Sequence, residues 1–314
     1  MFAALAALLA AATLPLTTVA TVPLPGGSSR LDYASIDTQR HRLYIAHLGG
    51  GLLIVVDTKT RRVVKSIPAP GAHGSLVVAE LGRVFASATD VHELLTIDEK
   101  TLKVIARAPA GSYPDGIAWD PDQRRVFVSD ETGGIESVFT PAGRRIGTIQ
   151  LGGEAGNVQY DPGSRHVLVD VQTRNDIAII DPRSQRVIRR VTLPNSCVHP
   201  HGLLVDAPRR VAFVACDENA TLLTLDLDRL KVIGTASVGS NPDVLAFDTS
   251  LRRLYVSSES GVVSVFAERG RELTKLGQAF LANEAHTVAV DSRTHLVYFP
   301  LENGPVLRVM KPTR

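Results

Sequence analysis

The sequence predicts an all-β protein, a seven-bladed β-propeller whose blades are four-stranded antiparallel sheets. Two observations lead to this fold. A unit of 41 to 45 residues recurs seven times along the chain, and each unit holds short apolar runs separated by turn residues. Strand-like alternation continues throughout, and we find no long amphipathic helix. We therefore expect one propeller domain over residues 17–314.

Four copies of the unit are the clearest. They begin with LDYASIDTQRHRLYIAH at residue 31, PDGIAWDPDQRRVFVSD at 114, PHGLLVDAPRRVAFVAC at 200 and PDVLAFDTSLRRLYVSS at 242. Each reads as an apolar strand, an Asp, a turn, and a second strand of the type R-x-Y/F-V. A third strand ending in Asp and a fourth strand follow, as in IVVDTKTRRVVKSI. Weaker copies start near residues 73, 156 and 286.

The seventh unit ends with GPVLRVMKPTR and lacks a fourth strand. The stretch TTVATVPLP, residues 17–25, resembles the fourth strands RVVKSIPAP and LKVIARAPA of other units. We expect it to pair with residues 306–310 and to complete the last blade. Closing the circle in this way removes an exposed sheet edge.

The N-terminus carries an apolar run from Phe2 to Leu14, the length of a signal-peptide core and too short to span a bilayer. No Lys or Arg precedes it. We interpret residues 1–12 as a signal peptide, because cleavage after Ala12 keeps the closing strand whole while cleavage after Ala20 removes half of it. We expect export to a periplasm or secretion, and no later stretch reads as a transmembrane helix.

Charge and composition fit a soluble globular protein, with 44% hydrophobic and 21% charged residues and a net charge of +2. The basic residues are scattered along the chain rather than clustered. This argues against a nucleic-acid partner, which normally meets a basic stripe. We expect a monomer.

The first strand of each propeller blade lines the central axis, and the loop that leads into it opens at the upper face. One residue per unit occupies this position, and we call the set the axial ring. Six of its seven members are His or Asp. The members, in chain order, are Asp32, His73, Asp115, Gly156, His201, Asp243 and His286.

The axial ring has two interpretations. His73, His201 and His286 are spread nearly evenly around it and would suit zinc, copper or iron. In that case four carboxylates would orient the imidazoles or act as a general base. These are Asp32, Asp115, Asp243 and Glu284. Alternatively, the ring is a hydrated polar mouth that binds a small molecule or a peptide without catalysis.

The two cysteines lie at facing ends of neighbouring strands in the fifth unit. Cys197 precedes the first strand and Cys216 ends the second. In an exported protein, two cysteines so placed are usually paired. We expect a disulfide, with thiolate ligation of a metal as the alternative.

These repeats resemble the YVTN-type, YncE-like family of seven-bladed propellers. RLYIAH, RVFVSD and RLYVSS stand where that family has its Y-V-T-N strand, and VVDTKTRRVV and IIDPRSQRVI match its following turn. The resemblance covers nearly the whole chain and implies the propeller fold. Related propellers include lactonases and an antibiotic-opening lyase, and Pro200-His201-Gly202 and Glu284-Ala285-His286 resemble residue contexts of the lyases.

Two functions follow as alternatives. One is an exported enzyme that uses the axial ring with a divalent transition metal for hydrolysis or elimination on a small molecule. The other is a non-catalytic propeller that binds a ligand or a protein partner through its upper face. The fold by itself does not distinguish them.

Overall fold

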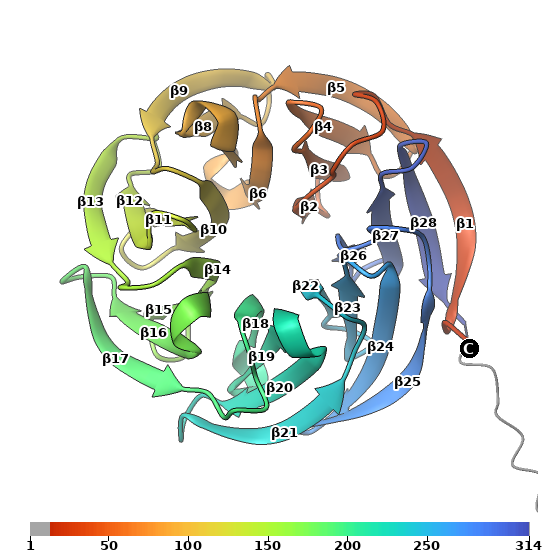
Figure 1. The fold of residues 1–314 in the computed structure, drawn as a ribbon. Coiled ribbons are helices and arrows are strands. Elements are labelled where there is room, and N and C mark those ends of the chain that lie inside the picture. The colour runs from red at the N-terminus through yellow and green to blue at the C-terminus, as the bar shows by residue number, and fades with distance from the viewer. Residues whose placement is uncertain (1–12, 314) are drawn as a thin grey trace, which may run out of the picture.

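The computed structural model describes residues 13–313, which form seven four-stranded antiparallel sheets around one axis (Figure 1). In each blade the first strand lies nearest the axis and the fourth lies at the circumference. This confirms the predicted seven-bladed propeller. The signal peptide predicted for residues 1–12 lies outside the described residues.

Six blades take their strands consecutively from the chain, and the seventh combines three C-terminal strands with β1. Blade by blade, the strands are β2 (Ala34–Asp37), β3 (Arg42–His47), β4 (Leu52–Asp57) and β5 (Arg62–Pro68); β6 (Ala72–Val78), β7 (Arg83–Ala88), β8 (Glu93–Asp98) and β9 (Lys103–Pro109); β10 (Pro114–Asp120), β11 (Arg125–Asp130), β12 (Ile135–Phe139) and β13 (Arg145–Gln150); β14 (Ala155–Asp161), β15 (His166–Val171), β16 (Asp176–Asp181) and β17 (Arg186–Thr192); β18 (Pro200–Asp206), β19 (Val211–Cys216), β20 (Thr221–Asp226) and β21 (Lys231–Ser237); β22 (Pro242–Asp248), β23 (Arg253–Ser258), β24 (Val262–Arg269) and β25 (Glu272–Phe280); and β26 (Ala289–Asp291), β27 (Leu296–Leu301), β28 (Val306–Pro312) and β1 (Leu16–Pro23).

Short 3₁₀ helices occupy some of the connections between strands. They are η1 (Ala79–Leu81), η2 (Thr89–Val91), η3 (Gln172–Arg174), η4 (Ala207–Arg209) and η5 (Asp217–Asn219).

The ring is closed by β1, as the sequence predicts. β1 runs antiparallel to β28, with Leu16 opposite Pro312 and Pro23 opposite Val306. Its side chains Leu16 and Val22 are buried, Leu16 in an apolar cluster with blade 6 and Val22 in one with blade 1. The first strand of the chain therefore covers what would otherwise be the open edge of the last blade.

The recurrent Asp residues shape the turns at one end of the blades. Asp37 Oδ1 accepts hydrogen bonds from the backbone N–H groups of Gln39 and Arg40, at 2.8 and 2.9 Å. Equivalent carboxylates accept backbone N–H groups in other units. They belong to Asp57, Asp98, Asp120, Asp161, Asp181, Asp226, Asp248 and Asp291.

The aromatic residue of the R-x-Y/F-V strands holds neighbouring blades together. Tyr44 of blade 1 is fully buried and belongs to one apolar cluster with Val84 and Ile97 of blade 2. Other members of this position are also fully buried, which explains why the repeat retains an aromatic there. They are Phe85, Phe127, Phe213, Tyr255 and Tyr298.

Placing a charge on the inner side of β1 should open the closure. We expect Val22→Asp to lower the free energy of unfolding by several kcal/mol, because it buries an unpaired carboxylate. Thr21→Asp is the matched control, since Thr21 is exposed on the other side of the same strand. Urea titrations followed by circular dichroism measure both variants. Equal losses in the two variants would contradict this account of closure.

Candidate functional site

The axial ring lies at irregular positions of the innermost strands. In blades 2 to 6 the register between the first and second strands shifts at the ring position. A β-bulge re-aims a side chain out of strict alternation. In blades 1 and 7 the ring residue does not lie on the first strand, contrary to the prediction from the sequence, because β2 and β26 are short. Asp32 and His286 therefore come from the segments that precede these strands.

Two glycines next to the ring let adjacent blades approach closely. A Cβ atom on Gly74 would lie 2.1 Å from the carbonyl oxygen of Asp115, and one on Gly202 would lie 2.1 Å from that of Asp243. Any larger residue would therefore push the neighbouring blade away. The glycine of the Pro200-His201-Gly202 motif thus has a packing role beside the ring.

Each ring histidine lies close to an aspartate of another blade. His73 Nε2 is 3.2 Å from Asp32 Oδ2 and 3.5 Å from Asp115 Oδ1. His201 Nε2 is 3.2 Å from Asp243 Oδ1, and His286 Nε2 is 3.8 Å from Asp32 Oδ2. The ring is therefore a network of alternating histidines and aspartates.

Hydrogen bonds fix the orientation of two of these imidazoles. His286 Nδ1 lies 3.0 Å from the carbonyl oxygen of Glu284, which can only accept, so Nδ1 carries the proton. His201 Nδ1 faces Gln172 Oε1 at 3.1 Å. The amide nitrogen of Gln172 donates to Glu131 and Ala155, which fixes the direction of that amide. In both histidines Nε2 is left facing the carboxylates.

Asp32, Asp243 and His286 form a compact group of metal-ligand type. One ligand atom from each lies within 4.8 Å of the others. All three side chains are buried, and Asp32 Oδ1 and His286 Nε2 make no hydrogen bond with the part of the chain described, while Asp243 Oδ1 faces His201 Nε2 at 3.2 Å. Buried polar atoms left without partners cost free energy. Two carboxylate oxygens and one imidazole nitrogen could hold a divalent metal ion.

This group overlaps only partly with the ligand set expected from the sequence. It contains one predicted metal ligand, His286, and two residues predicted as catalytic carboxylates, Asp32 and Asp243. His73 and His201 are outside it, although the Nε2 atom of each lies 3.2 Å from one of its carboxylates. Glu284 has an exposed side chain and meets the site through its backbone carbonyl.

Arg30 connects the two carboxylates of the group. Its Nε donates to Asp32 Oδ2 at 2.8 Å, and its Nη2 lies 3.6 Å from Asp243 Oδ2. Its Nη1 donates to Glu259 at 2.7 Å. A planar guanidinium suits this bridging role because its donors are held in a fixed fork.

The network shifts the protonation of its members in opposite directions. Burial by itself lowers the pKa of His73, but Asp115 and Asp32 outweigh burial and raise that pKa to about 9. Burial raises the pKa of Asp115 to about 7, although His73 and His201 oppose the change. Burial favours the neutral form of Asp32, but His73, His286 and Arg30 hold its pKa well below the ordinary value. Asp115 can thus exchange a proton near neutral pH.

An open polar cavity of about 260 Å³ lies at the upper mouth, above the ring. Asp243 lines this cavity and also belongs to the metal-ligand group, so the two are contiguous. Tyr113 packs its ring against His73, with ring centroids 5.3 Å apart. The full lining is Arg30, His73, Tyr113, Glu131, Gln172, His199, His201, Asp217, Asp243 and Glu259.

Several of these lining residues were missed by sequence reasoning. Glu131, Gln172, Asp217 and Glu259 each follow the last residue of a second strand. The last residues of two second strands, His47 and Asp130, instead support loops: His47 bonds Ser29 and Pro25, and Asp130 accepts backbone N–H groups. The residue directly after each second strand, compared across the repeats, is the sequence signal for these cavity-lining positions.

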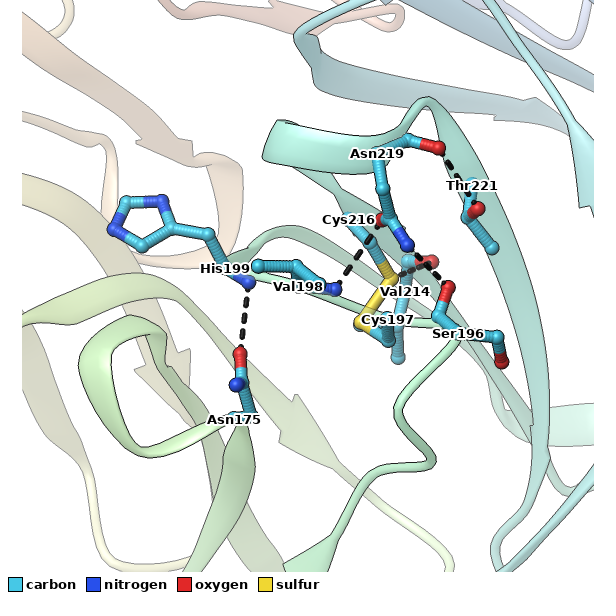
Figure 2. The surroundings of a disulfide bond; sticks show 9 residues. All are labelled: Asn175, Ser196, Cys197, Val198, His199, Val214, Cys216, Asn219 and Thr221. Carbon is cyan, nitrogen blue, oxygen red and sulfur yellow. Dashed lines mark hydrogen bonds between the residues drawn. A yellow bond between two sulfur atoms is a disulfide. The ribbon is translucent and has the colours of Figure 1, made fainter.

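The disulfide expected between Cys197 and Cys216 is present, with Cα atoms 5.2 Å apart (Figure 2). It anchors the loop that carries His199 to the end of β19. The backbone N–H of His199 donates to Asn175 Oδ1 at 2.8 Å, and its imidazole points away from the disulfide toward the cavity (Figure 2). The φ angle of His199 is 59°, a left-handed conformation that the anchored loop maintains.

Comparisons with known proteins support the resemblance to YncE. No family model matches the chain. It is 26% identical over 95 residues to YncE of Salmonella typhi and to YncE of Salmonella typhimurium strain LT2, both described as uncharacterized. The match covers 30% of this chain and 27% of each relative, so it spans only a minor part of either protein.

Similarity to solved structures extends over almost the whole chain. A chain of the Kuenenia stuttgartiensis hydrazine synthase has a TM-score of 0.78 at 14% identity, covering 94% of this chain and 97% of that one. A chain of a mitotic checkpoint complex has a TM-score of 0.81 at 10% identity, covering 95% and 92%. At these identities the similarity shows the fold alone.

Stability of the metal-free protein should fall as pH rises through the range set by His73. Folded His73 holds its proton up to about pH 9, whereas the ordinary pKa is 6.5. The contribution of protonated His73 to the free energy of unfolding is therefore complete below pH 6.5 and is lost between pH 6.5 and about 9. We expect His73→Gln to flatten the pH dependence of the free energy of unfolding over this interval. His166→Gln, at the opposite end of blade 4, is the control, and equal slopes in wild type and His73→Gln would disprove the assignment.

Removing the disulfide should cost stability. The double variant Cys197→Ser with Cys216→Ser is expected to unfold with a free energy lower by about 3 kcal/mol, because the bond closes a loop between residues 19 positions apart. Urea titration measures the loss, and non-reducing mass spectrometry of the wild type checks that the thiols are oxidised. A variant as stable as the wild type would contradict this role.

Proposed function

We propose that this chain, a seven-bladed propeller with sequence similarity to YncE, is an exported metal-dependent enzyme. It would catalyse the hydrolysis of a small polar molecule or an elimination from it. The observation that carries the proposal is the buried group of Asp32, Asp243 and His286, in which one ligand atom of each residue lies within 4.8 Å of the others. Its member Asp243 also lines the open polar cavity.

The donor set suits a divalent transition metal such as zinc, copper or iron. Three protein ligands leave room for a water molecule or a substrate oxygen, the arrangement of catalytic zinc sites. The backbone carbonyl of Glu284 holds His286 with Nε2 toward Asp32, as orienting partners of metal-bound histidines do. When bound, the ion would polarise a substrate oxygen or lower the pKa of a water molecule.

Asp115 is the proton acceptor in this proposal. It is fully buried beside His73, neither of its carboxylate oxygens has a hydrogen-bond partner within the described residues, and burial raises its pKa to about 7. A group with that pKa can take a proton from water or from substrate carbon near neutral pH. His201, whose pKa Asp243 raises despite burial, lines the cavity and would place a positive charge near the developing negative charge.

A second candidate is a propeller that binds a ligand or protein partner without catalysis. The position of Arg30 favours it, because the guanidinium already bridges Asp32 and Asp243. The ring charges are then compensated without an ion, and the cavity would serve as a polar binding site. Metal content separates the two candidates.

Export agrees with the disulfide, because such bonds form and persist in oxidising compartments. Within residues 13–313, no helix is both long enough and apolar enough to cross a membrane. We propose a periplasmic or secreted, monomeric protein.

The metal proposal is tested by elemental analysis after loading the protein with zinc, copper or iron and removing free ion. We expect stoichiometric metal in the wild type and at least a 10-fold weaker affinity in Asp243→Asn and His286→Gln, because each removes a ligand. His199→Gln is the control, since His199 lines the cavity outside the ligand group. His73→Gln and His201→Gln should retain the metal if Asp32, Asp243 and His286 are the ligands. They should lose it if the three histidines are the ligands.

The enzymatic proposal is tested separately on a panel of small lactones and esters. Asp115→Asn should retain metal but lose most of the metal-dependent turnover, because it removes the proton acceptor. A wild-type protein that takes up no metal would overturn the enzyme in favour of the ligand-binding propeller.

A further inference from the structure

The propeller topology gathers basic side chains on one face. Inner strands run in the same direction in all blades, so the turns after the first and third strands share the face opposite the cavity. We call this the basic face. Its exposed basic side chains come from every blade: Arg40, Lys59, Arg61, Arg62, Lys100, Lys103, Arg124, Arg144, Arg165, Arg183, Arg186, Arg209, Arg229, Lys231, Arg269, Arg293 and Lys311.

Turn chemistry explains why the exposed charge of this face is mainly basic. The Asp residues of these turns direct their carboxylates inward to backbone N–H groups, and most are buried, as Asp37, Asp161 and Asp226 are. Some basic neighbours pair with these carboxylates, as Arg40 does with Asp37 and Arg229 with Asp226. Others, such as Lys59, Lys100 and Arg183, are exposed and have no carboxylate within 4.0 Å among the described residues. The exposed acidic residues of the same turns are Glu80, Asp122, Asp228 and Glu272.

The opposite face has the reverse character. Among residues 13–313, the loops around the cavity carry the basic side chains Arg30 and Arg174, and Arg30 is paired with carboxylates. Their acidic side chains outside the axial ring are more numerous. They include Asp90, Glu131, Glu154, Asp217, Glu218, Glu259, Glu284 and Glu302. The disc thus has one basic and one acidic face, although its net charge is only +2.

We propose that the basic face docks on an anionic lipid surface and holds the cavity toward the aqueous compartment. The distribution of charge favours a planar partner. Basic side chains occur on all seven blades rather than along one strip, so a surface could meet them together, whereas a single polyanion strand would follow a groove or stripe. Each cation near such a surface strengthens binding roughly five-fold. The proposal is independent of the metal site.

Three turn residues allow a sharp test. Lys59, Lys100 and Arg183 stand two residues after the turn aspartates of blades 1, 2 and 4 and are exposed. In the described structure none of them lies within 4.0 Å of a carboxylate, so reversing them breaks no ion pair. The control reverses Lys65, Arg107 and Arg189, exposed residues in the outer strands of the same blades. Arg107 pairs with Glu93 at 3.3 Å, so the control variant also loses one surface ion pair.

The probe is sedimentation with vesicles of phosphatidylcholine, with and without phosphatidylglycerol, using the full protein. We expect binding to the anionic vesicles only, weakening as salt shortens the Debye length. Lys59→Glu with Lys100→Glu and Arg183→Glu should weaken it by about 100-fold or more. The control triple variant, with the same change in net charge, should weaken it far less. Circular dichroism melts check that both variants fold.

Three results would overturn the proposal: no binding to anionic vesicles, equal losses in the two triple variants, or a short single-stranded oligonucleotide that binds where vesicles do not. The last result would assign the basic face to an acidic polymer instead of a lipid surface.

Discussion

The pairing of β1 with β28 is the constraint on which the rest of this molecule depends. Seven blades share one axis only if the last blade is completed, and here the strand that completes it comes from the other end of the chain. Without that strand the edge of β28 would be unpaired, and blade 7 would lose the apolar cover that Val22 provides. Asp32 and His286 stand in blades 1 and 7, on either side of this closure. The geometry of the candidate metal group is therefore set by it.

Charge compensation governs the interior of the mouth. Buried carboxylates are tolerated there because each one faces an imidazole or the guanidinium of Arg30. The compensation is incomplete: Asp115 and the metal-ligand group keep unpartnered atoms within the part of the chain described. In a folded core such atoms are costly unless they have a function. This imbalance, rather than the fold, is what points to chemistry at the axis.

The turns at the other end obey a different rule with a comparable consequence. A carboxylate that accepts two backbone N–H groups must point into its turn, while the basic residues beside it lie at the surface, where some, such as Arg40, reach back to the carboxylate and others, such as Lys59, do not. Repeating this turn in blade after blade makes a face whose charge differs from that of the whole chain. Along the sequence the basic residues are scattered, but the topology brings them together.

Local pattern and the period of the repeat are enough to predict the number of blades, the closing strand, the cysteine pair and the residues of the axial ring. They also predict that His286, Asp32 and Asp243 lie in one layer. They do not predict which of these atoms meet, because bulges at His73 and His201 and the short first strands of blades 1 and 7 displace side chains by amounts that a periodic pattern does not contain. The bridging by Arg30 and the separation of charge between the two faces also depend on the fold. Both arise from residues that are far apart in the sequence and come together only when the blades assemble.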